Sequence, residues 1–258
     1  MEKMNNTLED GLRILELLAH ADGPVALTDI ADRLGLGKSK AHRLLQTLVL
    51  ANYVFQPAGS TKYLASIKLW SLGSAILRHD GLRTAAEPHM QWLMETTGES
   101  VHLSILEDLE IVYVHKVDSE QPVRAYSQIG GRMPAHLVAT GKALLAFQSP
   151  ASLAIMYERL AGSARLPVKE KQAFIDEMRT IRETRVAVNR GEWREGVYGI
   201  ASPIMDHKGA VVAAIGVSGP SERFGSEALV RYADAVRDAA HAIAVKLFGE
   251  LYVPFLNR

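Results

Sequence analysis

Apolar residues in the first third of the chain recur three or four positions apart, which is the spacing of one face of an α-helix. The first such stretch covers 7–19, where Thr7 and Asp10 stand three apart in the manner of a capping box. The run HADGP at 20–24 then combines residues that stop a helix and form a turn. The sequence therefore predicts a helix, a turn, and a second helical region that begins near Thr28.

That region, 28–53, contains two short helical patterns around a turn. Thr28 can cap the first helix, and Gly35 and Gly37 bracket the turn, where glycine tolerates a positive φ. A second helix is predicted to start near Lys38. The predicted inward residues are Ile30, Ala31, Leu34, Ala41, Leu44, Leu45 and Leu48, and the outward residues of the second helix are Lys38, Lys40, His42, Arg43, Gln46 and Thr47. A second helix that is polar on its exposed side indicates a helix-turn-helix that reads DNA.

Two short runs rich in aromatic and β-branched residues follow at 53–55 and 61–64, with turn residues at 56–60. They predict a β-hairpin, which would complete a winged helix-turn-helix. A polar helix face alone does not establish DNA binding, because any surface helix has one. The charge pattern favours it: the chain has 29 acidic residues, but none lies between 33 and 79, where the basic residues are Arg33, Lys38, Lys40, Arg43, Lys62, Lys68 and Arg78.

The stretch 66–79 predicts a linker helix whose apolar residues are too widely distributed for a helix that only solvent surrounds. We interpret it as a connection that packs against a partner or a second domain. A simple core helix is the alternative that the pattern leaves open.

The remaining chain alternates helical patterns with runs rich in Val, Ile, Tyr and Leu. The predicted helices are 82–96, 135–147, 151–160, 168–184 and 226–248, and the predicted strands are 100–106, 110–117, 124–129, 186–188, 196–205 and 210–218. Antiparallel strands with helices outside them indicate an α+β domain. We therefore predict a DNA-binding domain at 1–65, a linker helix at 66–79 and an effector-binding domain at 80–258.

Composition narrows the classes of protein that fit. The 29 Lys and Arg residues balance the 29 Asp and Glu residues, which excludes a uniformly basic surface but not a local basic patch. The chain has no cysteine, so disulfides, thiol catalysis and thiolate metal sites are excluded. The start has no apolar core of signal-peptide length, and no run approaches the length of a membrane span. We expect a soluble protein of the cytoplasm.

Several motifs in a fixed order carry a family resemblance. They are GLRILELLA at 11–19, LTDIADRLGLGKSKAHRLLQTL at 27–48, VHLSILEDLEIVYVHKVDS at 101–119, GGRMPAHLVATGKALLA at 130–146, EGVYGIASPIMD at 195–206 and VVAAIGVSGP at 211–220. Over nearly its whole length the chain resembles the isocitrate lyase regulator (IclR) family of bacterial transcription factors. The resemblance implies a winged helix-turn-helix, a linker helix and a C-terminal effector domain with a GAF-like antiparallel sheet and flanking helices. It also implies a dimer or a dimer of dimers on a near-palindromic operator.

Candidate DNA contacts come from the helix at Lys38, which we expect in the major groove, and from the hairpin. The candidates are Lys38, Ser39, Lys40, His42, Arg43 and Gln46 on the helix and Lys62 on the wing. Lys40, Arg43 and Gln46 are expected to face base edges or phosphates, and Lys62 a backbone phosphate.

The resemblance further implies a small organic acid as effector, held between the central sheet and its flanking loops. The positions that it carries across are Ala139, Thr140, Gly141, Asn189, Gly199, Gly216 and Ser218, with Met133, His136 and Leu137 as a wall. Free backbone N–H groups at the start of the helix near Thr140 would favour an anion.

Three of these positions depart from family members that bind very small acids. Asn189 stands where Asp is frequent, Gly199 where Cys is often seen, and Gly216 where a hydroxyl residue occurs. The departures imply a roomier pocket and an effector larger than a two-carbon acid, such as an aromatic acid or an acyl derivative of one. Alternatively, the aromatic residues Tyr113, Tyr126, Trp193 or Tyr198 fill the space.

No catalytic residue, cofactor or metal is predicted. His102, His115, His136 and His207 could gather around a metal, but without cysteine or an H-x₃-H pair we favour hydrogen-bonded or exposed histidines. The alternative function is an enzyme or small-molecule carrier with an accessory basic helical domain. The acid-free stretch and the lack of a recognisable pairing of nucleophile and base favour the regulator, so we expect no enzymatic activity.

Overall fold

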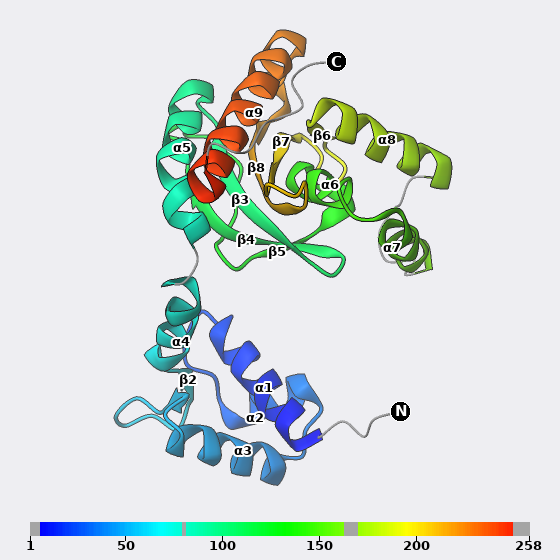
Figure 1. Cartoon of the computed structure of the whole chain (residues 1–258). Coiled ribbons are helices and arrows are strands. Elements are labelled where there is room, and N and C mark those ends of the chain that lie inside the picture. Colours follow the sequence, from blue (N-terminus) through cyan, green and yellow to red (C-terminus); the bar gives the residue numbers. More distant parts are fainter. Residues whose placement is uncertain (1–5, 79–80, 163–169, 250–258) are drawn as a thin grey trace. The chain divides into compact units, whose positions relative to one another are not determined.

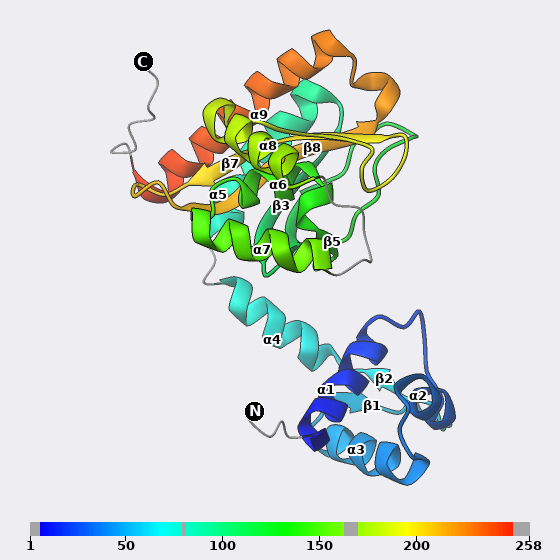
Figure 2. The same ribbon diagram turned by 90° about the vertical axis from the view of Figure 1, so that its right-hand side faces the viewer.

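A computed structural model describes residues 6–78, 81–162 and 170–249. The chain divides into two compact units, Met1–Asp80 and Gly81–Arg258 (Figures 1 and 2). Within the described ranges, no helix is both long enough and apolar enough to cross a lipid bilayer.

The N-terminal unit is a winged helix-turn-helix, as predicted. Its elements are α1 (Asn6–Ala19), α2 (Leu27–Leu34), α3 (Lys38–Leu50), β1 (Val54–Phe55), β2 (Leu64–Ala65) and α4 (Ile67–Arg78). Strands β1 and β2 pair antiparallel, and a bridge between Val25 and Tyr63 ties the chain before α2 to the hairpin. The predicted inward residues of α2 and α3 join Ile14 and Leu18 of α1 in one core.

Both predicted helix caps in this unit are wrong. Helix α2 begins at Leu27, and its N-cap is Ala26, whose side chain offers no hydrogen bond, so Thr28 lies inside the helix. Thr7 lies inside α1, and the Asp10 carboxylate bonds to Lys40 and Arg13. Of the two turn glycines, Gly35 has a φ of 64° and ends α2. Capping depends on the local path of the backbone, which side-chain spacing alone does not specify.

Helix α4 is the predicted linker helix, and its first half is not a core helix. Ile67 and Trp70 have 76% and 69% of their surface exposed. Ser66 and Lys68 fasten its beginning to the rest of the unit: the Ser66 hydroxyl donates to the Asn52 carbonyl at 2.5 Å, and the Lys68 ammonium to the Ala51 carbonyl at 2.8 Å. Large exposed apolar side chains on a fixed helix are typical of a surface that another chain or domain covers.

The C-terminal unit is a six-stranded antiparallel sheet with helices on both faces, which confirms the predicted α+β class (Figures 1 and 2). The strand order is β5-β4-β3-β8-β7-β6. The strands are β3 (Ser100–Glu107), β4 (Glu110–Val117), β5 (Arg132–Pro134), β6 (Ala187–Arg190), β7 (Val197–Met205) and β8 (Val211–Pro220). The helices are α5 (Gly81–Thr97), the 3-10 turn η1 (Ala135–Leu137), α6 (Ala139–Leu145), α7 (Pro150–Gly162), α8 (Lys171–Thr184), the 3-10 turn η2 (Ser221–Arg223) and α9 (Ser226–Phe248).

Alternation along the strands separates two cores. The first core lies between the sheet and helices α5 and α9 and includes Val101, Leu103, Ile215 and Ile243. The second lies on the opposite face, where α6 and α8 pack, and the strand residues there are small, such as Ala201 and Ala214. Successive side chains of a strand point to opposite faces, so each strand contributes to both cores. The small residues let α6 approach the sheet closely.

Two predicted elements in this unit are wrong. The segment 124–129 is not a strand, because β5 pairs with the edge of β4 and the carbonyls of Ala125 and Ser127 accept hydrogen bonds from side chains instead. The single helix predicted at 135–147 is interrupted at Val138, whose extended backbone (φ −126°) separates η1 from α6. The beginning of the helix predicted at 168 lies outside the described residues, and α8 starts at Lys171.

Gly141 makes the interruption possible. A Cβ atom at this position would lie 2.1 Å from the Ala135 carbonyl oxygen, so only glycine allows η1 to fold back onto α6. Gly11, in α1, has no neighbour within 4 Å of the same position.

This difference predicts opposite effects of one substitution at two helical glycines. Gly11→Ala should raise the free energy of unfolding by about 1 kcal/mol, because alanine is the better helix former. Gly141→Ala should lower it by about 1–3 kcal/mol, because the backbone of Ala135 must move. Urea unfolding of the full chain, followed by circular dichroism, measures both. A Gly141→Ala protein as stable as the parent would contradict the close packing of η1 on α6.

Candidate nucleic-acid interface and ligand cavity

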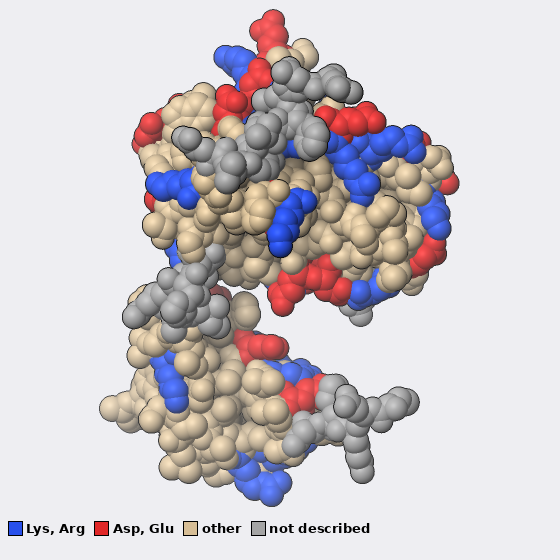
Figure 3. Space-filling model, in the orientation of Figure 1, with Lys and Arg blue, Asp and Glu red and all other residues tan. Residues whose placement is uncertain are grey.

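One stripe of α3 consists of exposed polar side chains. Ser39, His42, Arg43 and Gln46 are exposed and lie three, four and seven positions apart, so they share one face. Lys38 and Thr47 beside them are also exposed, whereas Ala41 and Leu45 on the opposite side are completely buried. Figure 3 shows basic side chains at the lower edge of this unit, where Figure 1 places α3, and no acidic side chain at that edge in this view. A base-reading helix requires such a surface.

Lys40, one of the predicted DNA contacts, has a partner within the unit. Its ammonium group pairs with the Asp10 carboxylate of α1, a largely buried group that Arg13 also contacts at 3.4 Å. The pair joins the first helix to the third. We expect the charge of Lys40 to contribute little to DNA binding, because Asp10 already matches it.

The hairpin of the wing contains one predicted DNA contact, Lys62. Lys62 is exposed, and its backbone N–H donates to the Ser60 hydroxyl at 3.1 Å, which shapes the tip of the wing. The side chain of Lys68, in contrast, lies 4.2 Å above the Tyr53 ring in addition to its bond to Ala51. Of these two lysines, Lys62 is the one available to a phosphate.

The second unit contains a cavity on the α6 face of its sheet. The space within it that a water-sized molecule can occupy is about 70 Å³, and its mouth opens to solvent. Of the predicted effector positions, its lining includes Met133, Ala139, Thr140, Asn189, Gly199, Gly216 and Ser218. His136 and Gly141 are not part of that lining, because Gly141 packs against Ala135 of the turn that contains His136.

Asn189, Gly199 and Gly216, the three positions that differ from family members that bind very small acids, do not all enlarge the cavity. A Cβ atom at Gly216 would lie 2.7 Å from both the Cβ of Ala201 and the carbonyl of Ile200, so this glycine accommodates the neighbouring strand and adds no space. At Gly199 the nearest atoms would be 3.2–3.6 Å away, which is tight but not closed. Asn189 uses its side-chain oxygen to accept bonds from the backbone N–H groups of Gly191 and Glu192, at 3.1 and 3.0 Å.

A neutral histidine forms part of the cavity wall. His102 Nε2 is 2.7 Å from the Ser218 hydroxyl, and Nδ1 is 3.1 Å from the Ser127 hydroxyl. Burial, reinforced by the Lys116 ammonium, lowers the pKa of His102 to about 4, despite the opposing charge of Asp118. Burial also raises the pKa of Tyr113 to about 12, and this ring lies 5.0 Å from the imidazole. At neutral pH both groups are uncharged and offer hydrogen bonds without charge.

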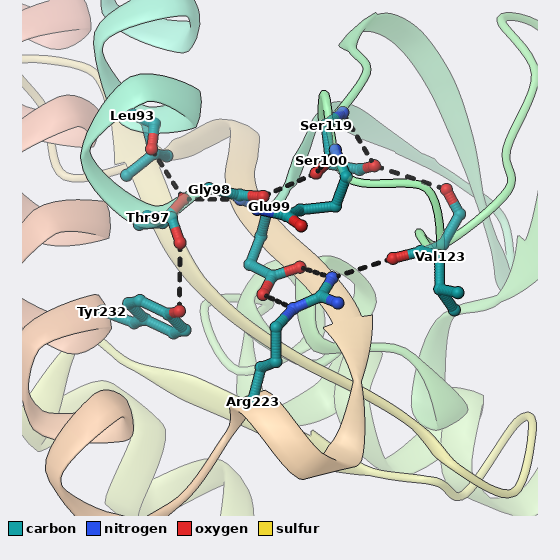
Figure 4. A network of polar contacts seen from close by, with 11 residues as sticks. Leu93, Thr97, Gly98, Glu99, Ser100, Ser119, Val123, Arg223 and Tyr232 are labelled. Atoms are coloured by element: carbon teal, nitrogen blue, oxygen red, sulfur yellow. Dashed lines mark hydrogen bonds and ion pairs between the residues drawn. The ribbon is translucent and has the colours of Figure 1, made fainter.

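The segment between β4 and β5 forms another part of the cavity wall, and a polar network fixes this segment (Figure 4). The buried Glu99 carboxylate accepts two hydrogen bonds from Arg223, at 2.5 and 2.7 Å, and Arg223 also donates to the Val123 carbonyl at 3.1 Å. The Ser100 hydroxyl donates to the carbonyl of Ala125, which lines the cavity. A buried carboxylate that lost its partner would lower the free energy of unfolding by about 3–5 kcal/mol, so this network holds the segment firmly.

Sequence reasoning missed several lining residues as ligand contacts. Trp193 and Arg194, in the loop between β6 and β7, line the cavity together with His102, Tyr113 and Ser127. Tyr126 and Trp193 appear in the sequence only as possible space fillers. The available signal was the alternation of β3, which places His102 on the same face as Ser104, and Ser104 donates to Thr140 of α6. Trp193 and Arg194 could not be found from the spacing of apolar residues, because they lie in a loop, which has no repeating pattern.

The remaining histidines lie apart from one another. His115 pairs with Glu87, and the His207 ring lies 6.4 Å from the ring of Phe248. Across the residues that the structure describes, no three His, Cys, Asp or Glu side chains are grouped as metal ligands would be.

Both units match known protein families. The profile "IclR helix-turn-helix domain" matches residues 7–57, and the profile "Bacterial transcriptional regulator IclR C-terminal" matches residues 74–245. The chain belongs to the IclR family of bacterial transcriptional regulators. The predicted family is therefore confirmed, and a DNA-binding regulator that responds to a small molecule is the function of that family.

Relatives of this IclR-family chain match almost its entire length. The HTH-type transcriptional regulator KdgR of Escherichia coli (strain K12) is 30% identical over 254 residues, which cover 96% of this chain and 95% of KdgR. The crystal structure of Thermotoga maritima IclR superimposes with a TM-score of 0.77 at 29% identity, covering 95% of this chain and 100% of that one. An IclR homologue from Microbacterium hydrocarbonoxydans, solved in complex with 4-hydroxybenzoate, has a TM-score of 0.79 at 26% identity and covers 93% and 98%.

Proposed function

We propose that this IclR-family regulator binds a near-palindromic operator as a dimer or a dimer of dimers and that a small, preferably aromatic, organic acid is its effector. The observation that carries the proposal is the pairing of two surfaces in one chain. One unit exposes the cationic stripe of α3, and the other encloses a cavity with aromatic walls and one charged lining residue, Arg194. The first suits a polyanion and the second a small organic anion.

On DNA, Ser39, His42, Arg43 and Gln46 face base edges, while Lys38 and Lys62 face phosphates. Arginine and glutamine can each bind a base edge through two hydrogen bonds, which gives them the strongest base discrimination among these side chains. One recognition helix reads one half-site, so two copies related by a two-fold axis would read a near-palindrome. The exposed Ile67 and Trp70 of α4 support an association between copies.

The effector proposal rests on the walls of the cavity. The rings of Tyr113 and Trp193 suit a flat ligand, and the hydroxyl groups of Ser127, Ser218 and Thr140 suit a polar substituent. The complex of the Microbacterium hydrocarbonoxydans homologue with 4-hydroxybenzoate supports an aromatic acid in this fold.

One observation favours an enzyme as the second candidate function. The Ser218 hydroxyl lies 2.7 Å from His102, which is the geometry of a nucleophile and its base and which sequence reasoning did not find. However, a histidine with a pKa of about 4 is a weak base, and Nδ1 faces the Ser127 hydroxyl, which cannot stabilise an imidazolium as a carboxylate does. These features favour a binding site over a hydrolytic one.

The DNA contacts predict different effects of two alanine substitutions. Arg43→Ala should weaken operator binding by about 1–3 kcal/mol, because it removes a base contact. Lys40→Ala should leave operator affinity nearly unchanged and lower the free energy of unfolding by about 1–3 kcal/mol, because Asp10 loses a partner. Fluorescence anisotropy on a duplex selected from a random pool by the parent protein measures the first, and urea unfolding the second. Equal losses of DNA affinity would place Lys40, too, on the DNA.

The cavity walls predict the order of effector affinities. Benzoate-type ligands should bind more tightly than glyoxylate or pyruvate, because the smaller acids cannot contact both aromatic walls. Isothermal titration calorimetry of the full chain measures each affinity. Tighter binding of glyoxylate or pyruvate would overturn the aromatic effector.

A further inference from the structure

The loop between β6 and β7, residues 191–196, carries two donors without a side-chain partner into the cavity wall. Trp193 Nε1 is buried and has no hydrogen-bond acceptor among the described residues. Arg194 lines the cavity, and no carboxylate in the described parts of the chain pairs with its guanidinium group. A buried indole N–H normally has an acceptor, so its lack of one indicates where a ligand atom belongs.

We propose that this loop is the carboxylate-binding element of the cavity: Trp193 Nε1 donates to one carboxylate oxygen of the effector, and the Arg194 guanidinium pairs with the carboxylate. The inference rests on the proposed function, in that the effector is an organic acid. It assigns recognition of the charge to the β6–β7 loop rather than to the beginning of α6, which the family resemblance suggested. Helix α6 is only seven residues long, so its dipole is a weak alternative anchor.

The charges around the cavity support an anionic ligand. Its lining contains no Asp or Glu, and Arg194 is the one residue of that lining with a permanent charge. The positive charge of Arg194 opposes the rise in the pKa of Tyr113, so its field reaches the cavity wall. His102 is neutral at physiological pH and therefore does not compete as a cation. A carboxylate would enter a region with one positive charge and no negative one.

Buried contacts hold the loop in the position that this role requires. The Lys142 ammonium of α6 donates to Glu192 at 2.5 Å, to Glu177 at 3.0 Å and to the Val188 carbonyl at 3.2 Å. Burial would raise the pKa of Glu192, but the hydrogen bond and charge of Lys142 lower it below its ordinary value, so the Glu192 carboxylate stays ionised at neutral pH. Asn189 of β6 also accepts hydrogen bonds from the backbone N–H groups of Gly191 and Glu192. Contacts from both α6 and β6 therefore hold the residues just before Trp193. A loop whose backbone is already held in place loses little conformational entropy when a ligand binds.

The test compares benzoate with benzamide, a neutral ligand of nearly the same shape, by calorimetry on the full chain. The parent should bind benzoate more tightly. Arg194→Gln should weaken benzoate binding about 10–100-fold and leave benzamide binding nearly unchanged, because a hydrogen-bonded charge pair is lost. Trp193→Phe keeps the ring and removes the donor, and it should weaken benzoate binding about 5–10-fold. Arg190→Gln, the same change four residues earlier and outside the lining, is the matched control.

The outcomes separate the two proposals. If the parent binds benzoate and Arg194→Gln binds it as tightly as Arg190→Gln does, the carboxylate-binding loop is wrong, while the effector proposal stands. If the parent binds benzamide as tightly as benzoate, the loop does not read the charge, and this inference is also overturned. If the parent binds neither benzoate nor another organic acid, both proposals fail. Circular dichroism of each variant verifies that it is folded.

Discussion

Lys142 is 1% exposed, and an ammonium group so deeply buried is stable only when it is paired. Its partners come from three places: Glu177 on α8, the Val188 carbonyl on β6 and Glu192 in the β6–β7 loop. One buried charge therefore fixes the helix that forms one wall of the cavity and the loop that forms another. The geometry of the cavity therefore depends on this interaction, because loops have few buried contacts of their own.

The small residues of β7 and β8 complete that arrangement. Ala201 and Ala214 allow α6 to approach the sheet, and Gly216 lets β8 and β7 lie close together. The opposite face of the same sheet is filled by Leu103, Ile215 and the apolar side of α9, which makes a dense core. A rigid face and a hollow face on one sheet suit a sensor, because a ligand can alter the hollow face while the core remains intact.

Much of the fold was predictable because it depends on local periodicity. The start of α3, the limits of α9 and β4, and the hairpin of the wing follow from apolar spacing and turn residues. The failures occurred where residues distant in the sequence decide the structure. The segment at 124–129 has a strand-like composition, but the side chains of Ser100 and Lys116 capture its carbonyls.

The candidate site was predictable where its residues lie on regular helices and strands. Among the positions that the family motifs indicated, Ala139, Thr140, Gly199 and Ser218 line the cavity, and they lie on regular elements. The pairing of Lys40 with Asp10 could not be predicted, because the two residues are thirty positions apart in the sequence. The loop residues Trp193 and Arg194 have no sequence period, and their importance emerges only from a buried N–H without an acceptor and from a cavity lining without acids.

If the cavity binds the effector, its occupancy should change the affinity of α3 for DNA. The most direct measurement is operator affinity by fluorescence anisotropy, with and without saturating concentrations of the tightest-binding aromatic acid. We expect a change of about 5–150-fold, the usual size of an allosteric coupling, with the operator affinity of unliganded Arg194→Gln equal to that of the parent. An aromatic acid that binds the cavity measurably and leaves operator affinity unchanged would show that the cavity does not regulate DNA binding.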